Sequence, residues 1–185
     1  MLKKGCFAIL FLLLVGILNT YAQKTSIWIV RHAEKQTAEG AMSNTDPDLT
    51  ADGDKRAHDL AAVLKNQKIA AVYSTPYKRT TSTGGPAAAT RQLKMTIYTA
   101  KDYKAFATGI LQNHQGKEVL VVGHSNTIIP LATALGAAVP FETLSDDDYD
   151  MLFKIVIDNN STAKLNIRHY GAPHHTTEIP AAYKL

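Results

Sequence analysis

Continuous apolar runs alternate along the chain with segments in which apolar residues recur at helical spacing. Three of the runs show no polar alternation: 26–30, 69–73 and 119–122. Such runs predict strands that are buried on both faces, as in a parallel sheet. The helical patterns lie among them, at 50–67, 102–113 and 127–135. This alternation predicts an α/β fold, a three-layer α/β/α sandwich with a mostly parallel central sheet.

The C-terminal part of the chain has a different pattern. Two segments, 152–158 and 163–170, flank the turn signal Asn159-Asn160-Ser161, and apolar and polar residues alternate in the second segment. That pattern predicts an antiparallel hairpin at the edge of the sheet. Residues 171–185 show no periodicity, so we interpret them as a surface tail.

Residues 1–22 have the layout of a secretory signal peptide. Lys3 and Lys4 precede an apolar run at 6–18, and Thr20-Tyr21-Ala22 provides small residues at the usual cleavage position. The run is shorter than the ~20 residues that span a bilayer. We therefore expect an exported protein, periplasmic or secreted, with one folded domain at 23–170 and no membrane attachment after cleavage. An uncleaved N-terminal anchor is the alternative.

Composition narrows the possible chemistry. Apolar residues make up 45% and charged residues 19% of the 185 positions, as in ordinary globular proteins. The formal net charge is +4, and removal of Lys3 and Lys4 leaves 4 − 2 = +2, too little to indicate a nucleic-acid partner. The single cysteine, Cys6, lies in the predicted signal peptide. The folded domain therefore has no disulfide, thiolate nucleophile or cysteine zinc site.

Three predicted strands end in polar residues that are not ordinary turn residues. These are Arg31-His32-Ala33-Glu34, Ser74-Thr75-Pro76 with Lys78 and Arg79 beyond it, and Gly123-His124-Ser125-Asn126. In open α/β sheets, ligands bind outside the carboxyl ends of the strands. Arginine matches phosphate oxygens in a bidentate way, and histidine can act as a nucleophile. Two arginines around an imidazole predict phosphoryl transfer.

Four segments together resemble the histidine phosphatase superfamily, also called phosphoglycerate mutase-like. They occur in the family's order: Arg31-His32-Ala33-Glu34, Leu49-Thr50-Ala51-Asp52-Gly53, Ser74-Thr75-Pro76-Tyr77-Lys78-Arg79-Thr80 and Val121-Val122-Gly123-His124-Ser125. The first resembles the family's RHG-type motif, with Ala33 where glycine is usual. The resemblance makes 23–170 a histidine phosphatase-like catalytic domain, similar to the small bacterial members without a large cap.

The resemblance implies a reaction and the roles of its main residues. His32 would attack a phosphomonoester and form a phosphohistidine, which water then hydrolyses. Arg31, Arg79 and His124 would hold the phosphate oxygens and stabilise charge in the transition state, and Ser125 would join them in binding substrate. No cofactor and no metal is implied. His32 must be neutral to attack, whereas a protonated His124 would help to bind a phosphate dianion.

The proton donor is less well defined by the motifs. Between the second arginine and the second histidine there are only two carboxylates, Asp102 and Glu118. Glu118 begins its predicted strand and so lies at the wrong end of the sheet. Asp102 opens a predicted helix near the rim, where it is either the proton donor or a helix cap. Glu34, close to His32, is the other candidate, and a good leaving group needs no strong acid at all.

Two other functions compete with this interpretation. Gly123-His124-Ser125-Asn126-Thr127 lies between a strand and a helix, as the nucleophile elbow of a serine hydrolase does. The second glycine of that motif is missing, and this function leaves His32 and both arginines unexplained. The other alternative is a catalytically weak phosphate-binding domain that keeps the same pocket.

Several further polar residues are interpreted as structural or solvent-exposed. Lys35 and Lys78 are assigned to the surface, and His174-His175, in the predicted tail, have no fixed partners in the sequence and are not assigned to a metal. A cluster of acidic residues lacks the glycine turn and distal glutamate of a calcium loop. We interpret it as a solvated loop; its members are Asp146, Asp147, Asp148 and Asp150.

The predicted export narrows the choice within the family, because it argues against a glycolytic mutase whose substrates are cytoplasmic. Only 44 residues lie between Arg79 and His124, too few for a large cap domain. We therefore expect a metal-independent phosphatase of the histidine acid phosphatase type. Its substrate would be a phosphorylated small molecule or a phosphoprotein, met outside the cytoplasm.

Overall fold

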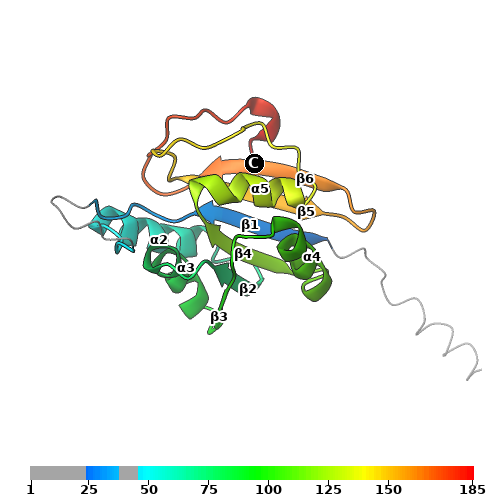
Figure 1. Cartoon of the computed structure of the whole chain (residues 1–185), viewed down its shortest axis with the longest axis horizontal. Coiled ribbons are helices and arrows are strands. Elements are labelled where there is room, and N and C mark those ends of the chain that lie inside the picture. Colours follow the sequence, from blue (N-terminus) through cyan, green and yellow to red (C-terminus); the bar gives the residue numbers. More distant parts are fainter. Residues whose placement is uncertain (1–23, 38–45) are drawn as a thin grey trace, which may run out of the picture.

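The structure is a computed structural model, and it describes residues 24–37 and 46–185. Six strands form one mixed sheet in the order β3-β2-β4-β1-β5-β6 (Figure 1). The strands are β1 (Thr25–Arg31), β2 (Ile69–Ser74), β3 (Met95–Ile97), β4 (Glu118–Gly123), β5 (Met151–Ile157) and β6 (Ala163–His169). The signal peptide predicted at 1–22 lies outside the described residues.

The sheet combines a parallel part with an antiparallel edge. β1 pairs in parallel with β4, β4 with β2, and β2 with β3. β5 runs antiparallel to β1, and β6 antiparallel to β5. The predicted mostly parallel sheet with a C-terminal antiparallel hairpin is therefore confirmed.

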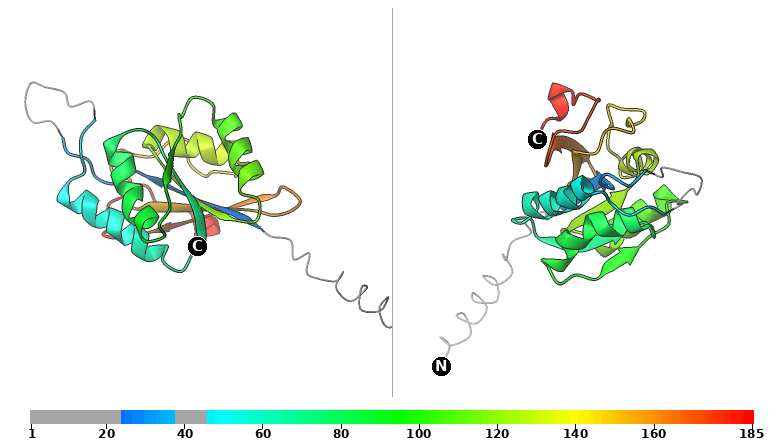
Figure 2. Two further views of the ribbon diagram at one scale, coloured as in Figure 1. Left: turned by 90° about the horizontal axis from the view of Figure 1, so that it is seen from below. Right: turned by 90° about the vertical axis from the view of Figure 1, so that its left-hand side faces the viewer.

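Helices cover both faces of the sheet (Figure 2). They are α2 (Ala51–Val63), α3 (Lys78–Ala89), α4 (Tyr103–Asn113) and α5 (Ser125–Ala134), and a short 3-10 helix, η1, follows at Ala181–Tyr183. Side chains of β1 alternate between the faces: Ile27 and Ile29 pack with α4 and α5, whereas Trp28 and Val30 pack with α2 and α3. This two-sided burial explains why the strand is apolar throughout.

Helix α3 is an element that the periodicity does not predict. Its sequence contains Gly84, Gly85 and Pro86, which are poor helix formers. Tertiary packing overrides this weak propensity. A Cβ atom at Gly84 would lie 3.0 Å from the side chain of Met95 and 3.2 Å from that of Val122, so the glycine lets the helix approach the sheet closely.

The Leu49–Gly53 motif begins α2 and holds it against the end of β1. The Thr50 hydroxyl caps the helix by accepting a hydrogen bond from the Gly53 amide at 3.0 Å. The Thr50 amide donates to the Glu34 carbonyl at 2.9 Å. A Cβ atom at position 53 would collide with that same carbonyl oxygen, so the close approach requires glycine.

The C-terminal segment 171–185, which we interpret from the sequence as a surface tail, contacts the domain along its length. Ile179 is buried, and the Leu185 amide donates to the Ile167 carbonyl at 3.0 Å.

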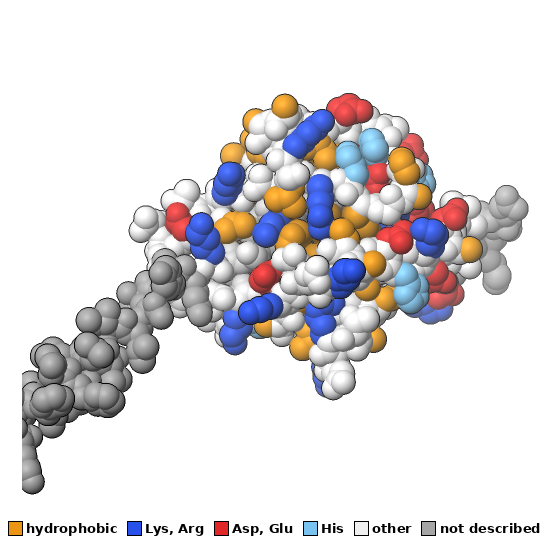
Figure 3. All heavy atoms as spheres, turned by 180° about the vertical axis from the view of Figure 1, so that it is seen from behind, with side chains coloured by type: hydrophobic (Ala, Val, Ile, Leu, Met, Phe, Trp, Pro, Cys, Tyr) orange, Lys and Arg blue, Asp and Glu red, His pale blue; other side chains and the backbone are white. Residues whose placement is uncertain are grey.

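Within 24–37 and 46–185, no helix is both long and apolar enough to cross a membrane. On the rear face of the molecule, lysine and arginine side chains are spread out, and histidine side chains lie beside acidic ones (Figure 3).

Candidate active site

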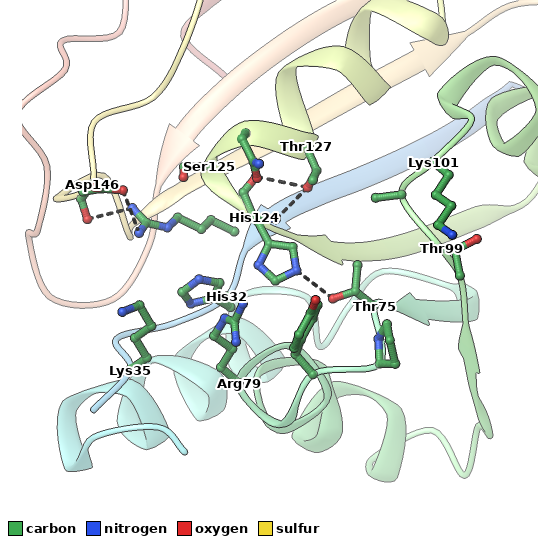
Figure 4. Close-up of a pocket in the computed structure, with 15 residues that line it drawn as sticks. His32, Lys35, Thr75, Arg79, Thr99, Lys101, His124, Ser125, Thr127 and Asp146 are labelled. Carbon is green, nitrogen blue, oxygen red and sulfur yellow. Dashed lines mark hydrogen bonds and ion pairs between the residues drawn. The ribbon is translucent and has the colours of Figure 1, made fainter. Parts of the chain in front are cut away.

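A cavity of about 710 Å³ opens at the carboxyl ends of β1, β2 and β4 (Figure 4). Fifteen residues line it: Arg31, His32, Lys35, Thr75, Pro76, Tyr77, Arg79, Thr99, Ala100, Lys101, His124, Ser125, Asn126, Thr127 and Asp146. The structure thus brings together the predicted phosphate-pocket residues Arg31, His32, Arg79, His124 and Ser125. The predicted proton donors, Asp102 and Glu34, are not among them.

His32 leaves the end of β1 with one of its ring nitrogens already engaged. Nδ1 lies 2.7 Å from the carbonyl oxygen of Ala33, and the His32 amide donates to the Gly123 carbonyl at 2.9 Å. Because a carbonyl oxygen only accepts, Nδ1 carries the proton and Nε2 keeps a lone pair. Burial, reinforced by the charges of Arg31 and its neighbours, lowers the pKa of His32 to about 3. The ring is therefore neutral at physiological pH, and Nε2 keeps its lone pair.

Ala33 occupies the position where the family motif usually has glycine. Its methyl group is fully buried in a small cluster with Leu49 and Ala57. Its amide donates to Thr83 Oγ1 on α3 at 2.9 Å. The extra methyl group is therefore part of the packing between β1 and α2, and it leaves the backbone of the motif hydrogen-bonded.

The tautomer of His124 is set by a chain of hydroxyl groups. Thr80 Oγ1 donates to backbone carbonyls, the nearer being that of Tyr77 at 2.8 Å. Thr80 therefore accepts from Thr75 Oγ1 at 2.9 Å, and Thr75 accepts from His124 Nε2 at 2.8 Å. Nε2 carries the proton in this arrangement, and Nδ1 is left as the second ring nitrogen (Figure 4).

The protonation state of His124 differs from the one expected for binding a dianion. Burial, with the charges of Arg79 and Arg31 added to it, lowers the pKa of His124 to about 4. The imidazole is thus neutral at pH 7 in this structure. Its ring centroid lies 5.3 Å from that of His32 and 5.3 Å from that of Tyr77.

Both arginines are held in place and yet retain an unpaired donor. Arg31 donates through one terminal nitrogen to the carbonyl oxygens of Ser145, at 3.1 Å, and Asp146, at 2.7 Å. The Arg79 guanidinium stacks over the Tyr77 ring at 4.4 Å. The Nε atoms of Arg31 and Arg79 are buried and have no hydrogen-bond partner among the described residues. Such orphaned buried donors are rare and indicate that an acceptor binds there.

Neither predicted proton donor lies in the cavity. Asp102 is exposed and caps α4, accepting from the Ala105 amide at 2.9 Å, as its alternative interpretation holds. Glu34 is paired with Arg56, with its shortest contact at 2.7 Å. Burial alone would raise the pKa of Glu34, but the hydrogen bonds from Arg56 and His174 hold it below its usual value. Glu34 is therefore an ionised structural carboxylate.

Asp146 is the carboxylate that lines the cavity, among the parts of the chain that the structure describes. Its side chain is 95% exposed and lies 3.6 Å from the Arg31 guanidinium. Sequence reasoning groups it with a solvated acidic loop, and no motif distinguishes it from its acidic neighbours. Only its position beside Arg31 in the folded chain identifies it.

The solvated-loop interpretation is correct for Asp146 and Asp147 and wrong for Asp148 and Asp150, which are buried. The Asp148 carboxylate accepts from the Ser145 amide at 2.8 Å and from the amides of Thr176 and Thr177 at 2.8 and 3.0 Å. It also accepts from the Thr177 hydroxyl. This carboxylate thus fixes the loop whose carbonyls hold Arg31, and it does so with residues of the C-terminal segment.

The remaining predictions concern Ser125 and the lysines. Ser125 lines the cavity as the first residue of α5, and no hydrogen bond joins it to a histidine within the described residues. A serine nucleophile activated by a neighbouring base is therefore absent from this geometry. Lys35, assigned to the surface from the sequence, lines the cavity, whereas Lys78 pairs with Asp48 at 3.5 Å.

Comparison with known proteins agrees with the motifs. Residues 27–102 match the model of the histidine phosphatase superfamily (branch 1). This match and the fold shared with the solved structures below support membership of the histidine phosphatase superfamily. The match includes the segments of His32 and Arg79, while that of His124 follows beyond it. No curated protein matches the chain significantly.

Several solved structures share the fold. Bacillus stearothermophilus YhfR is 17% identical with a TM-score of 0.61, over 76% of this chain and 95% of its own. The protein histidine phosphatase SixA, complexed with tungstate, is 20% identical with a TM-score of 0.61, over 78% and 96%. The alpha-ribazole phosphatase from Shigella flexneri is 20% identical with a TM-score of 0.58, over 83% and 100%.

Proposed function

We propose that the chain is a phosphatase that hydrolyses phosphomonoesters through a phosphohistidine on His32. One observation carries this proposal. His32 presents a neutral Nε2 in a cavity where two arginines keep buried Nε–H groups that have no partner in the part of the chain that the structure describes. A phosphate group supplies the acceptor oxygens that these donors lack, and it places its phosphorus atom before the lone pair of the imidazole.

The reaction proceeds in two displacements. Nε2 of His32 attacks phosphorus, an N–P bond forms, and the ester P–O bond breaks with its electron pair going to the leaving oxygen. Water then attacks phosphorus, the N–P bond breaks, and inorganic phosphate leaves. Arg31 and Arg79 stabilise the charge on the phosphoryl oxygens in both transition states. The chemistry uses side chains only and needs no metal or organic cofactor.

The leaving oxygen takes its proton from Asp146 or from water. Asp146 lines the cavity and is fully exposed, whereas Asp102 and Glu34 are engaged elsewhere. Among the described residues, no buried carboxyl group lines the cavity, so none is positioned there as a dedicated proton donor to the leaving oxygen. We therefore infer that substrates with good leaving groups, such as aryl phosphates, react faster than alkyl phosphates.

Two features support the substrate class that we propose. The cavity is open at the surface and carries Lys35 and Lys101 beside the arginines, which favours anionic substrates of varied size. Two of the proteins that share the fold are named for a phosphorylated small molecule and for phosphohistidine in proteins. We propose a phosphorylated small molecule or a phosphoprotein, and export from the cytoplasm on the signal-peptide pattern at 1–22.

The direct test is hydrolysis of p-nitrophenyl phosphate in the presence of EDTA. His32→Ala should lower kcat by ~10³-fold or more, as expected when a nucleophile is removed. His58→Ala is the matched control, because His58 is exposed on α2 and outside the cavity. Quenching at neutral or alkaline pH, followed by mass spectrometry, should detect phosphate on His32.

Two outcomes would count against the proposal. One is turnover by His32→Ala at the wild-type rate. The other is a wild-type protein that binds tungstate but neither hydrolyses the aryl phosphate nor becomes labelled. That second result would make the chain a phosphate-binding domain on this fold.

A further inference from the structure

Outside the cavity, three residues that are distant in the sequence converge on one buried carboxylate. Asp150 directly precedes β5, His169 ends β6, and His175 belongs to the C-terminal segment. Nδ1 of His169 lies 3.0 Å from Asp150 Oδ1, and Nδ1 of His175 lies 2.7 Å from Asp150 Oδ2. The two imidazole rings stack with their centroids 3.9 Å apart. The proposed catalytic reaction uses none of these three residues.

The three side chains differ in burial: the carboxylate lies inside the protein, and the two histidines lie nearer the surface. The side chain of Asp150 is 1% exposed, whereas those of His175 and His169 are 23% and 34% exposed. The charge is therefore inside the protein, and the rings form its outer wall. A small solute can reach the rings without unfolding of the core.

We propose that Asp150, His169 and His175 form a binding site for a divalent transition-metal ion of the Zn²⁺ type. Each of the three residues offers one ligand atom, and these atoms lie within 4.8 Å of one another. We assign Nδ1 as the ligand of both histidines, because it already faces the Asp150 carboxylate. Around tetrahedral Zn²⁺, ligand atoms stand roughly 2.0–2.2 Å from the metal, so neighbouring ligands are about 3.4 Å apart. The nitrogen–oxygen separations of 2.7 and 3.0 Å would have to widen by less than about 1 Å to reach this spacing.

The donor set selects among metals. Imidazole nitrogen favours zinc, copper and nickel, whereas calcium and magnesium require oxygen ligands. At present each Nδ1 carries a proton, because the ionised carboxylate can only accept. When a metal binds, each histidine shifts this proton to Nε2 and coordinates the ion through Nδ1. The ion then meets one carboxylate and two imidazole nitrogens.

A backbone hydrogen bond fixes the Asp150 carboxylate, as is common for carboxylates that bind metals. The amide of His174 donates to Asp150 Oδ2 at 2.9 Å, and ligating carboxylates are commonly fixed by such hydrogen bonds. The neighbouring imidazole of His174 faces elsewhere, with its Nδ1 2.8 Å from Glu34. The sequence pair His174-His175 is therefore divided between two carboxylates, and only His175 belongs to the proposed site.

A metal at this site would connect the C-terminal segment to the β5–β6 hairpin. His175 lies next to Thr176 and Thr177, which hold Asp148 and through it the loop around Arg31. Binding should thus stabilise the folded protein, because the ion binds the native arrangement of ligands and not the unfolded chain. The ion contacts no residue of the cavity, so hydrolysis should persist in EDTA.

The test is calorimetric titration of the untagged mature protein with ZnCl2. We expect one ion per chain, an affinity reduced at least about tenfold by His169→Ala or His175→Ala, and no reduction by His58→Ala. Zn²⁺ should raise the Tm of the wild type but not of the two variants. Ca²⁺ should not raise it. Both histidines are partly exposed, so their alanine variants should fold, and circular dichroism verifies this.

Asp150→Asn separates the proposed site from chance binding by surface histidines. The amide keeps the size of the side chain but removes the charge, so Zn²⁺ affinity should fall as it does in the histidine variants. If the double variant His169→Ala/His175→Ala binds Zn²⁺ as tightly as the wild type, the proposal is wrong. It is equally wrong if His174→Ala weakens binding as strongly as His175→Ala does. Neither readout depends on phosphatase activity.

Discussion

The two sides of the catalytic cavity are built by different physical means. On one side, His32 and His124 leave the ends of paired parallel strands, and backbone hydrogen bonds such as that from the His32 amide to the Gly123 carbonyl hold them. On the other side, Arg31 is held by a loop that the buried carboxylate of Asp148 fixes to the C-terminal segment.

This difference determines how each side should respond to substitution. Backbone ladders survive the loss of one side chain, so changes on the strand side should affect chemistry and leave the fold intact. A network centred on buried carboxylates tolerates the loss of a side chain less well, because removing one partner leaves a charge or a hydrogen-bond donor unpaired inside the protein. Changes on the carboxylate side should therefore affect stability or substrate binding first.

The largest effect should come from Glu34→Ala, which breaks another buried carboxylate network, outside the cavity. The substitution leaves the guanidinium of Arg56, 3% exposed, without its ion-pair partner. Breaking a buried pair in this way costs roughly 3–5 kcal/mol of stability. Asp59→Ala is the control, because Asp59 pairs with the exposed Lys55 on the same helix and should cost less than about 1 kcal/mol. Urea unfolding measures both, and equal losses would contradict the distinction.

Arg79→Ala should have an effect of nearly the same size, on the reaction and not on stability. Arg79 lies on α3, beside the two strand-end histidines in the cavity. Removal of one preorganised donor to a transition-state oxyanion lowers kcat by about 10²–10³-fold. The side chain is 14% exposed and lies at the start of α3, so the fold should remain intact. Lys78→Ala is the adjacent control and should change kcat little, since Lys78 does not line the cavity. An Arg79→Ala variant with unchanged kcat for an aryl phosphate would remove Arg79 from the reaction.

The strand side could be predicted from the sequence, and the carboxylate side could not. Apolar runs locate β1, β2 and β4, and because parallel strands share one carboxyl edge, His32, Arg79 and His124 had to converge. Helix α3 escaped prediction because packing against the sheet compensates for its glycines and proline. The motif that contains Arg79 nonetheless includes the first residues of α3.

The carboxylate side depends on pairs that no local pattern encodes. Asp148 and Asp150 stand among exposed acidic residues, and their partners lie in a segment without periodicity. Glu34 lies two residues after His32, and this position suggested a proton donor. In the folded chain, Glu34 instead forms an ion pair with Arg56 on α2. A contact between side chains far apart in the sequence appears only when the sheet order is known.

The pH dependence of stability should distinguish the two sides again. The pKa of His32 is lowered to about 3 when folded, against about 6.5 when unfolded. Between these values the unfolded chain binds the extra proton, so stability falls as the pH falls through this window. The contribution lost between pH 6.5 and 4 is about 3 kcal/mol at 1.36 kcal/mol per unit. This loss of stability comes from His32, on the strand side of the cavity.

His32→Gln provides the measurement for this window. The variant lacks the titrating imidazole, so its unfolding free energy should depend less steeply on pH between 6.5 and 4 than that of the wild type. The pKa values of Glu34, Asp148 and Asp150 are lowered from ordinary values near 4. Their stabilisation should be lost only in stronger acid, and in both proteins. Parallel profiles for wild type and variant would show that His32 does not titrate as we infer.

A smaller effect is expected for Asp148→Asn. The amide cannot accept from all the donors around position 148, so the loop at Ser145 should loosen and displace Arg31. Misplaced positioning groups weaken substrate binding and orientation, and we expect KM for an aryl phosphate to rise about tenfold with a smaller change in kcat. The exposed neighbour Asp147 supplies the control, because Asp147→Asn should leave KM unchanged. A loss confined to kcat would argue against a positioning role.

The smallest effect on activity should come from Asp102→Ala, which lies on neither side of the cavity. Asp102 caps α4 through the Ala105 amide, and loss of such a cap costs about 0.5–2 kcal/mol of stability. If Asp102 donated the proton to the leaving oxygen, the variant would instead lose activity on alkyl phosphates far more than on aryl phosphates. We expect equal rates for wild type and variant on both substrates, with only the urea midpoint lowered. Asp146→Asn, measured beside it, should slow alkyl phosphates selectively if the carboxylate beside Arg31 protonates the leaving oxygen, and otherwise water supplies that proton.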